Sequence, residues 1–236
     1  MNKTMQHNFI IQSKKQEVPG VTTLSLTLEN GSLPEWTAGQ YINIHFPDTG
    51  TPEGKAYSIS SAPHEEVFTL TVRDIGEFSR RLCTAEVGDT ILGSLPYGFF
   101  APEYEGTPLV LIASGISITP FRAILQDILH KNPERTVTLF HTIRNSADAI
   151  FLEELQKLTL GNFSAYHFVT REDNPTIPHR ATRRIHVNDI LETVSAPPET
   201  EFLLCGNISF TRDIWKALTE AGIHEHNIYT EAFFGH

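Results

Sequence analysis

The spacing of secondary-structure signals changes once along the chain, near residues 101–108, and this change constrains the fold more than any other feature. Before it, short runs of alternating apolar residues are separated by Gly and Pro, which is typical of closely spaced antiparallel strands. The segment A-P-E-Y-E-G-T-P follows. After it, apolar strand segments alternate with helical segments, which is typical of a parallel sheet covered by helices. The pattern predicts two domains of different classes, at residues 1–102 and 108–236.

The first domain is predicted to be an antiparallel barrel or sandwich, of which we favour the barrel. Its strands are expected at Val21–Leu28, Tyr41–Phe46, Val67–Val72 and Thr90–Ser94. A helix is expected over Phe78–Glu86, because that segment opens after Gly76 and ends before Gly88.

The second domain is predicted to be a doubly wound parallel sheet. Its strands are expected at Leu109–Ala113, Thr136–Thr142, Phe163–Thr170, Phe202–Cys205 and Asn227–Glu231. Its helices are expected at Thr119–His130, Ala149–Leu158 and Ser209–Ala221. Ligands of such sheets bind at the carboxyl ends of the strands, so we expect a crevice between the two domains to hold a pair of flat cofactors.

The composition argues against several classes of function. The 236 residues carry 28 acidic and 18 basic side chains, and the net charge of -10 disfavours nucleic acid or an anionic membrane as the main partner. Cys83 and Cys205 have no metal-binding spacing, and the pair His224 and His226 lacks a third ligand, so we expect no metal site. The sequence has no signal-peptide pattern and no apolar run long enough for a membrane span, so we expect a cytoplasmic protein.

Two short segments indicate chemistry. K-A-Y-S-I-S-S, residues 55–61, places a cation, an aromatic ring and hydroxyl groups where a buried strand would carry Val, Ile or Leu. A-S-G-I-S-I-T-P, residues 113–120, joins a strand to a helix N-terminus, where backbone N–H groups and the helix dipole favour a phosphate. Within it, Gly115 allows close approach to the backbone, and Thr119 and Pro120 suit the first helical turn.

These and further motifs resemble those of the ferredoxin–NADP reductase superfamily of flavoproteins. K-A-Y-S-I-S-S is similar to the family's R-x-Y-S-[IL]-x-[ST], A-G-Q-Y (38–41) to P-G-Q-Y, G-E-F-S (76–79) to G-x-x-S, and P-Y-G-F-F (96–100) to P-x-G-x-F. A-S-G-I-S-I-T-P-F resembles the glycine-rich nicotinamide loop, C-G-N (205–207) resembles C-G-P, and E-A-F (231–233) resembles the terminal E-x-F. The resemblance implies a six-stranded Greek-key barrel that binds FAD, followed by an NAD(P)-binding Rossmann-like domain.

The resemblance implies that Tyr57 stacks on the flavin ring, that Ser58 offers its hydroxyl to flavin N5 and that Lys55 meets the flavin phosphates. The residues expected at the flavin are Lys55, Ala56, Tyr57, Ser58, Ile59, Ser60, Val72, Gly76, Glu77, Phe78, Ser79, Phe233 and Phe234. FAD is favoured over FMN, because G-E-F-S matches the pyrophosphate-binding form of its motif.

The resemblance also implies that the second domain binds NADPH or NADH. The residues expected to bind this nucleotide are Ser114, Gly115, Ile116, Thr119, Pro120, Arg144, Thr170, Arg171, Cys205 and Gly206. The catalytic residues are expected to be Ser58, Cys205 and Glu231, the last two because they position the nicotinamide and help to exclude water. V-T-R-E-D (169–173) resembles the segment in which NADPH-using members hold the 2′-phosphate with an arginine, but members that use NADH carry a similar arginine.

The chain departs from the family pattern at several positions, among them Ile116, where many members have a hydroxyl group. Lys55 replaces an arginine and loses the planar fork that grips two phosphate oxygens, so Arg73 or Arg80 is expected to share that contact. Ser117 replaces a second glycine, which would cost about 1 kcal/mol or more if the backbone needs positive φ. Asn207 replaces a proline and Phe210 a frequent methionine. Most departures therefore fall on the nicotinamide side.

The implied function is a reductase that passes a hydride from NAD(P)H to flavin N5, and then single electrons to a separate acceptor such as a ferredoxin, a flavodoxin or an oxygenase component. One alternative is a reductase of small acceptors, such as ferric chelates, quinones or free flavin. Another is an electron-transfer subunit that binds flavin but no nicotinamide. Subunits of that kind usually carry cysteines for a cluster near the C-terminus, and this chain has none with that spacing.

Overall fold

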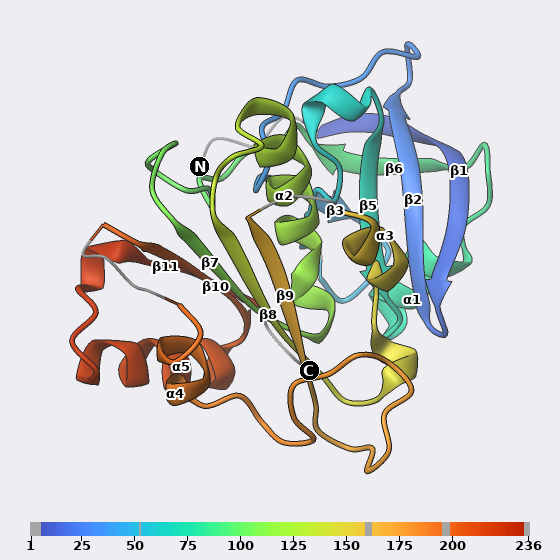
Figure 1. Cartoon of the computed structure of the whole chain (residues 1–236). Coiled ribbons are helices and arrows are strands. Elements are labelled where there is room, and N and C mark those ends of the chain that lie inside the picture. Colours follow the sequence, from blue (N-terminus) through green and yellow to red (C-terminus); the bar gives the residue numbers. More distant parts are fainter. Residues whose placement is uncertain (1–5, 52, 159–161, 195–198, 234–236) are drawn as a thin grey trace. The chain divides into compact units, whose positions relative to one another are not determined.

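The computed structural model describes residues 6–51, 53–158, 162–194 and 199–233 (Figure 1). They pack into two compact units. The first contains the described residues up to Ala101 together with Thr119–His130, and the second contains those of Pro102–Ile118 and from Lys131 onward. The first unit therefore includes one helix from the second half of the sequence. The cofactor-binding domain limits given above, 1–102 and 108–236, remain a prediction.

The first unit is built from an antiparallel sheet. Its elements are β1 (Gln6–Val18), β2 (Val21–Leu28), β3 (Tyr41–His45), β4 (Lys55–Ser58), η1 (Pro63–Glu65), β5 (Phe68–Arg73), α1 (Glu77–Thr84), β6 (Thr90–Ser94) and α2 (Thr119–Lys131, whose last residue lies in the second unit). The six strands are ordered β4-β3-β6-β1-β2-β5. An antiparallel bridge between Ile59 and Leu70 joins the two edge strands, so the sheet closes as a Greek-key barrel.

The barrel interior is filled by the inward-facing residues of its strands, because successive side chains of a strand point to opposite faces, together with residues of α1 and Ile59 after β4. The fully buried members are Phe9, Leu24, Leu26, Ile42, Ile44, Ile59, Phe68, Leu70 and Leu82. Two glycines of the motifs permit close contacts at the end of the barrel. Gly39 has a φ of +89°, and a Cβ there would overlap the carbonyl oxygen of Phe100. Gly98 has a φ of +108°, and a Cβ there would lie 2.8 Å from the Tyr41 ring.

The second unit is built on a parallel sheet. Its elements are β7 (Leu109–Ser114), η2 (Gly115–Ile118), β8 (Val137–Ile143), η3 (Ser146–Asp148), α3 (Leu152–Lys157), β9 (Phe163–Val169), α4 (Val187–Leu191), β10 (Glu201–Asn207), α5 (Ile208–Glu220), η4 (Glu225–Asn227) and β11 (Ile228–Phe233). The strand order is β11-β10-β7-β8-β9, so the chain moves outward from β7 to β9, returns beside β7 and moves outward again. This is a doubly wound order.

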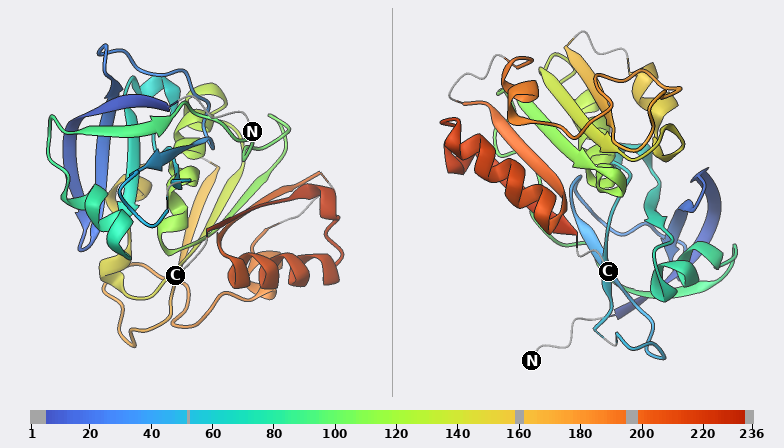
Figure 2. Two further views of the ribbon diagram at one scale, coloured as in Figure 1. Left: turned by 180° about the vertical axis from the view of Figure 1, so that it is seen from behind. Right: turned by 90° about the horizontal axis from the view of Figure 1, so that it is seen from below.

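Helices α4 and α5 cover one face of this sheet, and α5 lies along β10 and β11 (Figure 1, Figure 2). Their buried residues Ile190, Ile214 and Leu218 pack against Phe140, Phe202 and other residues of that face. The strands carry nearly continuous apolar runs, as expected for a parallel sheet that is buried on both faces. The predicted fold class, a Greek-key barrel followed by a doubly wound sheet, is confirmed.

Most predicted elements are found with ends shifted by one or two residues, and three differences have physical causes. Strand β1 was not predicted, because only Phe9 and Ile11 of its 13 residues are buried and register shifts interrupt its pairing with β2. Helix α4 was also not predicted, and it is only 5 residues long. The helix expected over 149–158 begins three residues later, because Phe151 adopts a left-handed conformation with φ of 60°.

Residues 103–107, at the beginning of the second unit, are held in place by the buried carboxylate of Glu201. It accepts hydrogen bonds from the Glu103 amide (2.6 Å), the Thr107 hydroxyl (2.9 Å) and the Arg135 guanidinium (2.8 Å). The side chains of Arg135 and Glu201 are 3% and 1% exposed. None of the described helices combines the length and the apolar character that crossing a membrane requires.

Candidate cofactor and nucleotide sites

Strand β4 and helix α1 bring an aromatic pair and a cation together on the first unit. The rings of Tyr57 and Phe78 stack with centroids 6.3 Å apart and an angle of 18° between planes. Lys55 Nζ lies 5.6 Å from the centroid of the Phe78 ring. Burial raises the pKa of the Tyr57 phenol above its ordinary value, so the ring stays neutral. The structure thus brings together three of the residues that the motifs predicted, on β4 and the first turn of α1.

The hydroxyl group of Ser58 has no hydrogen-bond partner within the described part of the chain, although its oxygen is buried. The residue is 6% exposed. A buried polar atom without a partner costs about 1–3 kcal/mol, and such groups in folded proteins need an explanation. A ligand that presents a polar atom at this edge of the barrel would satisfy the hydroxyl, and this fits the predicted contact with a flavin ring nitrogen.

The next residues of the motif are committed to the barrel. Ile59 is fully buried in the core. The Ser60 hydroxyl is hydrogen-bonded to those of Thr69 (2.8 Å) and Thr71 (2.9 Å). Val72 is also a core residue, 1% exposed, whereas Ala56 is exposed. The side chains of Ile59, Ser60 and Val72 are therefore occupied within the barrel, and main-chain atoms are what they offer to a ligand.

Helix α1 begins at Gly76 without a side-chain cap. The Ser79 hydroxyl points back along the chain and accepts hydrogen bonds from the amides of Ile75 (3.0 Å) and Gly76 (3.1 Å). A Cβ at Gly76 would meet no atom within 4 Å. The first-turn amides, which begin at Glu77, are therefore not capped by a side chain, and together with the helix dipole they suit an anion such as a pyrophosphate.

The basic residues expected near this helix differ in their surroundings. Arg80 pairs with Asp74 through a contact of 3.2 Å, and its side chain is 65% exposed. Arg73 is half-buried at the end of β5. Lys55 lies on β4 itself, with its Nζ near the Phe78 ring, so the replacement of an arginine by lysine keeps a positive charge at this strand.

The predicted nucleotide loop follows β7 in the second unit. Ser114, Gly115 and Ile116 are partly exposed, and a Cβ at Gly115 would meet nothing within 4 Å. Gly115 has a φ of +58°, which glycine adopts without strain. The open space and the exposed backbone fit the close approach of a phosphate. Thr119 and Pro120 are buried in the first turn of α2, which packs with the first unit.

Ser117, at the position of a family glycine, is not strained. Among the described residues, the non-glycine residues with positive φ are Glu66 and Phe151. Ser117 is 2% exposed, and its side chain is hydrogen-bonded to the thiol of Cys205. The serine therefore has a local structural role.

Cys205 and Glu231 are neighbours in the sheet. Cys205 lies between Ala113 on β7 and Glu231 on β11 in register. Burial, and then the charge of Glu231, hold the pKa of the Cys205 thiol well above its ordinary value, so the thiol is neutral. Burial also raises the pKa of Glu231 to about 7. Phe233 pairs with Asn207 at the end of β11, and Phe234 lies outside the described residues.

The C-G-N motif closes the start of helix α5. Asn207 is its N-cap, and its side-chain oxygen accepts hydrogen bonds from the Phe210 amide (2.9 Å) and the Ser209 hydroxyl (2.7 Å). A Cβ at Gly206 would lie 2.4 Å from the Phe210 ring, so the bulkier residue at position 210 depends on this glycine. Both departures from the family pattern thus have a structural reason in this chain.

Arg144 and Arg171 lie side by side at the ends of β8 and β9. The Arg171 amide donates to the Arg144 carbonyl (2.8 Å), and the Thr170 hydroxyl donates to the Ile143 carbonyl (3.1 Å). Both arginines are exposed, and neither guanidinium forms a salt bridge with another described residue. By contrast, Arg183 nearby in sequence is bound at 2.7 Å to Asp189. Two unpaired guanidinium groups at the carboxyl ends of strands suit an anionic group of a nucleotide.

The sequence did not identify two histidines beneath the nucleotide loop. His141 is fully buried, and its Nε2 lies 2.9 Å from the carbonyl oxygen of Gly115, which requires Nε2 to carry the proton. His167 is its neighbour on β9, with ring centroids 5.6 Å apart, and burial lowers the pKa of His167 to about 4. A histidine within the apolar strand T-V-T-L-F-H-T was the available signal for His141.

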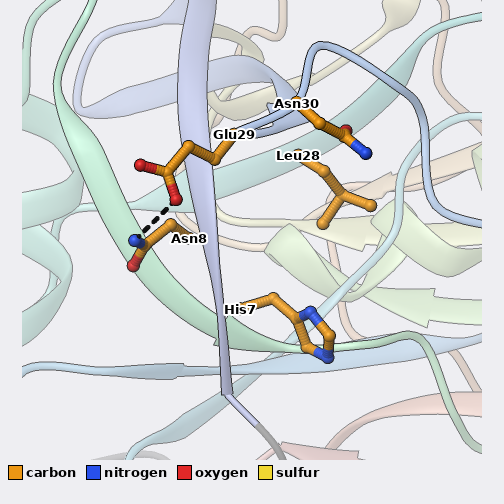
Figure 3. Close-up of a pocket in the computed structure, with 5 residues that line it drawn as sticks. All are labelled: His7, Asn8, Leu28, Glu29 and Asn30. Carbon is orange, nitrogen blue, oxygen red and sulfur yellow. Dashed lines mark hydrogen bonds between the residues drawn. The ribbon is translucent and has the colours of Figure 1, made fainter.

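A surface hollow of about 380 Å³ lies elsewhere on the first unit, where β1 begins and β2 ends (Figure 3). It is lined by His7, Asn8, Leu28, Glu29 and Asn30, and the Asn8 amide donates to the Glu29 carboxylate (3.0 Å). None of these residues belongs to the predicted sites. The described residues contain no cluster of three or more metal-binding side chains.

Comparisons with known proteins agree with this architecture. Residues 111–216 match the oxidoreductase NAD-binding domain family. A flavohemoprotein of Bacillus subtilis (strain 168) is 31% identical over 235 residues, which cover 95% of this chain and 58% of that protein. Reductase component 1 of a terephthalate 1,2-dioxygenase from Comamonas sp is 28% identical, over 94% of this chain and 67% of that one. The chain thus spans less than two thirds of the flavohemoprotein.

A solved structure of a ferredoxin NADP+ reductase from Neisseria gonorrhoeae, with bound FAD and NADP, superposes with a TM-score of 0.81 at 25% identity. The match covers 98% of this chain and 100% of that one. Both units are therefore shared with a reductase of this class. The resemblance of the chain to the ferredoxin–NADP reductase-like superfamily of oxidoreductases therefore extends over both units.

Proposed function

We propose that the chain is an FAD-dependent NAD(P)H reductase that delivers electrons to a separate acceptor. The observation that carries this proposal is the buried hydroxyl of Ser58, which has no partner among the described residues and follows directly on the Tyr57 ring of the Tyr57–Phe78 pair. A planar ring with a polar edge is the kind of ligand that satisfies both features. FAD, when bound, accepts a hydride and releases single electrons.

On the first unit, the chain's own groups bind and orient the flavin. Tyr57 offers a neutral ring for stacking, and Ser58 donates a hydrogen bond to a ring nitrogen. Lys55 and the uncapped amides at the start of α1 bind the phosphates. Because a single helix N-terminus with a G-x-x-S motif suits a pyrophosphate, FAD fits this site better than FMN.

On the second unit, the chain's groups position the nicotinamide nucleotide. The exposed backbone at Gly115 admits the nucleotide phosphates, and His141 fixes the carbonyl group of that glycine. The neutral Cys205 thiol and the partly protonated Glu231 present polar groups without a full charge. Such groups orient a nicotinamide ring and exclude water while favouring the transfer of a hydride over hydrolytic side reactions.

NADPH is the nucleotide that this site favours over NADH. Arg144 and Arg171 are adjacent and lack acidic partners in the described structure, so they are available to a 2′-phosphate. An NADH site would more often present a carboxylate to the ribose hydroxyls.

The acceptor is proposed to be another protein, since the Comamonas relative is a reductase component of a dioxygenase. A cytoplasmic location, where reduced nicotinamide nucleotides are supplied, belongs to the same proposal. The second candidate is a reductase of small acceptors such as ferric chelates, quinones or free flavin. A subunit without nicotinamide binding is disfavoured, because Ser117 and Asn207 both have structural roles that leave the Gly115 backbone exposed.

An anaerobic titration tests the proposal. The purified protein is loaded with FAD, its visible spectrum is recorded, and NADPH or NADH is added. Bleaching of the flavin absorbance by either nucleotide is expected, with NADPH effective at lower concentration. A protein that cannot be loaded with flavin would overturn the assignment. A loaded protein that neither nucleotide bleaches would favour the electron-transfer subunit.

A further inference from the structure

Arg122 of helix α2 forms an unusually complete set of contacts with the segment that follows β4. Its guanidinium binds both carboxylate oxygens of Glu65, at 3.0 Å and 2.9 Å, and donates to the carbonyl oxygen of Ser60 at 2.7 Å. The side chains of Arg122 and Glu65 are 17% and 19% exposed. Bidentate, partly buried pairs of this kind hold a fixed geometry, whereas exposed single contacts do not.

These contacts fix residues 60–62, which form the end of the K-A-Y-S-I-S-S motif and the residue after it. The Ser60 carbonyl is held by Arg122, the Ser61 carbonyl by the Trp36 indole (2.9 Å), and the Ala62 amide by the Glu65 carboxylate (2.7 Å). Glu65 therefore connects Arg122 to the backbone at residue 62. Ser60 is separated from Ser58, the predicted flavin contact, by a single residue.

Helix α2 connects directly to the other predicted site. Its first residue, Thr119, follows the loop Gly115–Ile118 without an intervening segment. Arg122 lies on the first turn of the helix. The ion pair thus fixes the first turn of the helix that begins directly after the nucleotide loop to the segment that follows β4.

We propose that Arg122, through its ion pair with Glu65, is a positioning residue that fixes the start of α2, and with it the end of the nucleotide loop, in the orientation that hydride transfer requires. The inference rests on the proposed function and adds a residue to it. Neither residue contacts the reacting atoms in this assignment. Misplacement of reacting groups by about 1 Å costs up to about 100-fold in rate, so loss of the ion pair should slow flavin reduction far more than it weakens flavin binding.

The test compares Arg122→Gln, Glu65→Gln, the double variant and Arg122→Lys, each loaded with FAD. Anaerobic stopped-flow absorbance measures the rate of flavin bleaching at saturating NADPH. Long-wavelength absorbance on addition of NADP+ reports stacking of the nicotinamide on the flavin. Flavin fluorescence gives the affinity for FAD, and thermal unfolding gives the melting temperature. Arg212→Gln is the control, because Arg212 is an exposed helix arginine that pairs only with its neighbour Asp213 among the described residues.

Each single Gln variant is expected to slow bleaching about 10-fold and to lose the long-wavelength band, while the affinity for FAD changes by less than about 3-fold. The double variant should be no slower than the slower single variant, because the two residues act as one unit. The bleaching rate of Arg122→Lys should lie between those of the wild type and Arg122→Gln, since lysine keeps the positive charge but cannot form the bidentate contact. The Arg212 variant should behave as the wild type.

Three results would overturn the inference. Additive effects of the two single variants would show that they do not act together. Slower bleaching that is fully explained by loss of FAD or by a lower melting temperature would show a merely structural role. If Arg122→Gln folds poorly, Glu65→Gln, which keeps the side-chain shape, still separates a structural role from a positioning role. An unchanged rate of flavin bleaching in the Gln variants would exclude a positioning role for Arg122 and Glu65. If wild-type protein with bound FAD is not bleached, the proposed function fails independently of these variants.

Discussion

Helices α1 and α5 both begin after a glycine motif, but the first unit leaves its helix start open and the second unit closes its own. At α1, Gly76 provides no cap and the Ser79 hydroxyl serves residues before the helix. At α5, Asn207 caps the first turn with its side chain. Ser58, also on the first unit, likewise has an open polar group, because its buried hydroxyl has no hydrogen-bond partner in the described chain.

The two helix starts suit ligands that stay bound for different lengths of time. Unsatisfied polar groups cost stability in the empty protein, so they favour a ligand that stays bound. Polar groups that are already satisfied leave a ligand less to gain, which suits one that must bind and leave in each turnover. The open start of α1 is therefore suited to a ligand that stays bound, and the capped start of α5 is not.

Closing the α1 start should have the largest effect. Gly76→Asp places a capping carboxylate at a position with extended backbone (φ of 176°) and no atom within 4 Å. The carboxylate would occupy the first-turn amides and repel a pyrophosphate. The dissociation constant for FAD, measured by fluorescence titration, should rise about 100-fold, or about 2.7 kcal/mol. Gly76→Ala is the control and should bind FAD normally. Tight FAD binding by Gly76→Asp would contradict an open anion site.

The buried carboxyl group of Glu231, on the second unit, gives the next largest effect. Burial raises its pKa from 4.5 to about 7, so the folded state holds a proton that the unfolded state releases between these values. Its contribution to stability is therefore present below about pH 4.5 and is lost as the pH rises to 7. Glu231→Gln should be more stable than the wild type at pH 8 by about 2 kcal/mol, and the difference should shrink at pH 5. Urea unfolding at both values measures it. An equal difference at both would refute the raised pKa.

Ser58 and Ser60 form a matched pair for the third prediction. In the protein without flavin, Ser60→Ala should lower the free energy of unfolding by about 1.5 kcal/mol, because it removes hydrogen bonds to Thr69 and Thr71. Ser58→Ala should cost nothing, since no hydrogen bond is lost. With FAD bound, the order should reverse for the rate of bleaching by NADPH. Urea unfolding and stopped-flow absorbance report the two properties, and equal behaviour of both variants would end the distinction.

Opening the α5 start should have the smallest effect. Asn207→Ala removes a cap and should lower the free energy of unfolding by about 1 kcal/mol. FAD binding should not change, because the residue lies on the other unit. Urea unfolding with and without FAD checks both statements. A loss of FAD affinity in this variant would show that the two helix starts are not independent.

The sequence predicted elements with strong periodicity and motifs with fixed order, and it did less well where structure depends on contacts distant in sequence. The strands of the parallel sheet were predicted because their apolar runs are nearly continuous. Strand β1 was not, because most of its residues face solvent. The bidentate ion pair of Arg122 with Glu65 joins residues 57 positions apart, and no local sequence pattern indicates this pair. The roles of Asn207 and Ser117 became visible only when their partners were placed.

The carboxylate of Glu201 has a practical consequence for residues 103–107. A segment rich in Pro, Gly and acidic residues would ordinarily attract proteases and tolerate insertions. Here its amides and a hydroxyl are tied to a buried anion that is itself neutralised by Arg135. Proteolytic cleavage within this segment should leave both new chain ends bound to Glu201. The cleaved protein should therefore elute from a size-exclusion column at the volume of the uncleaved chain.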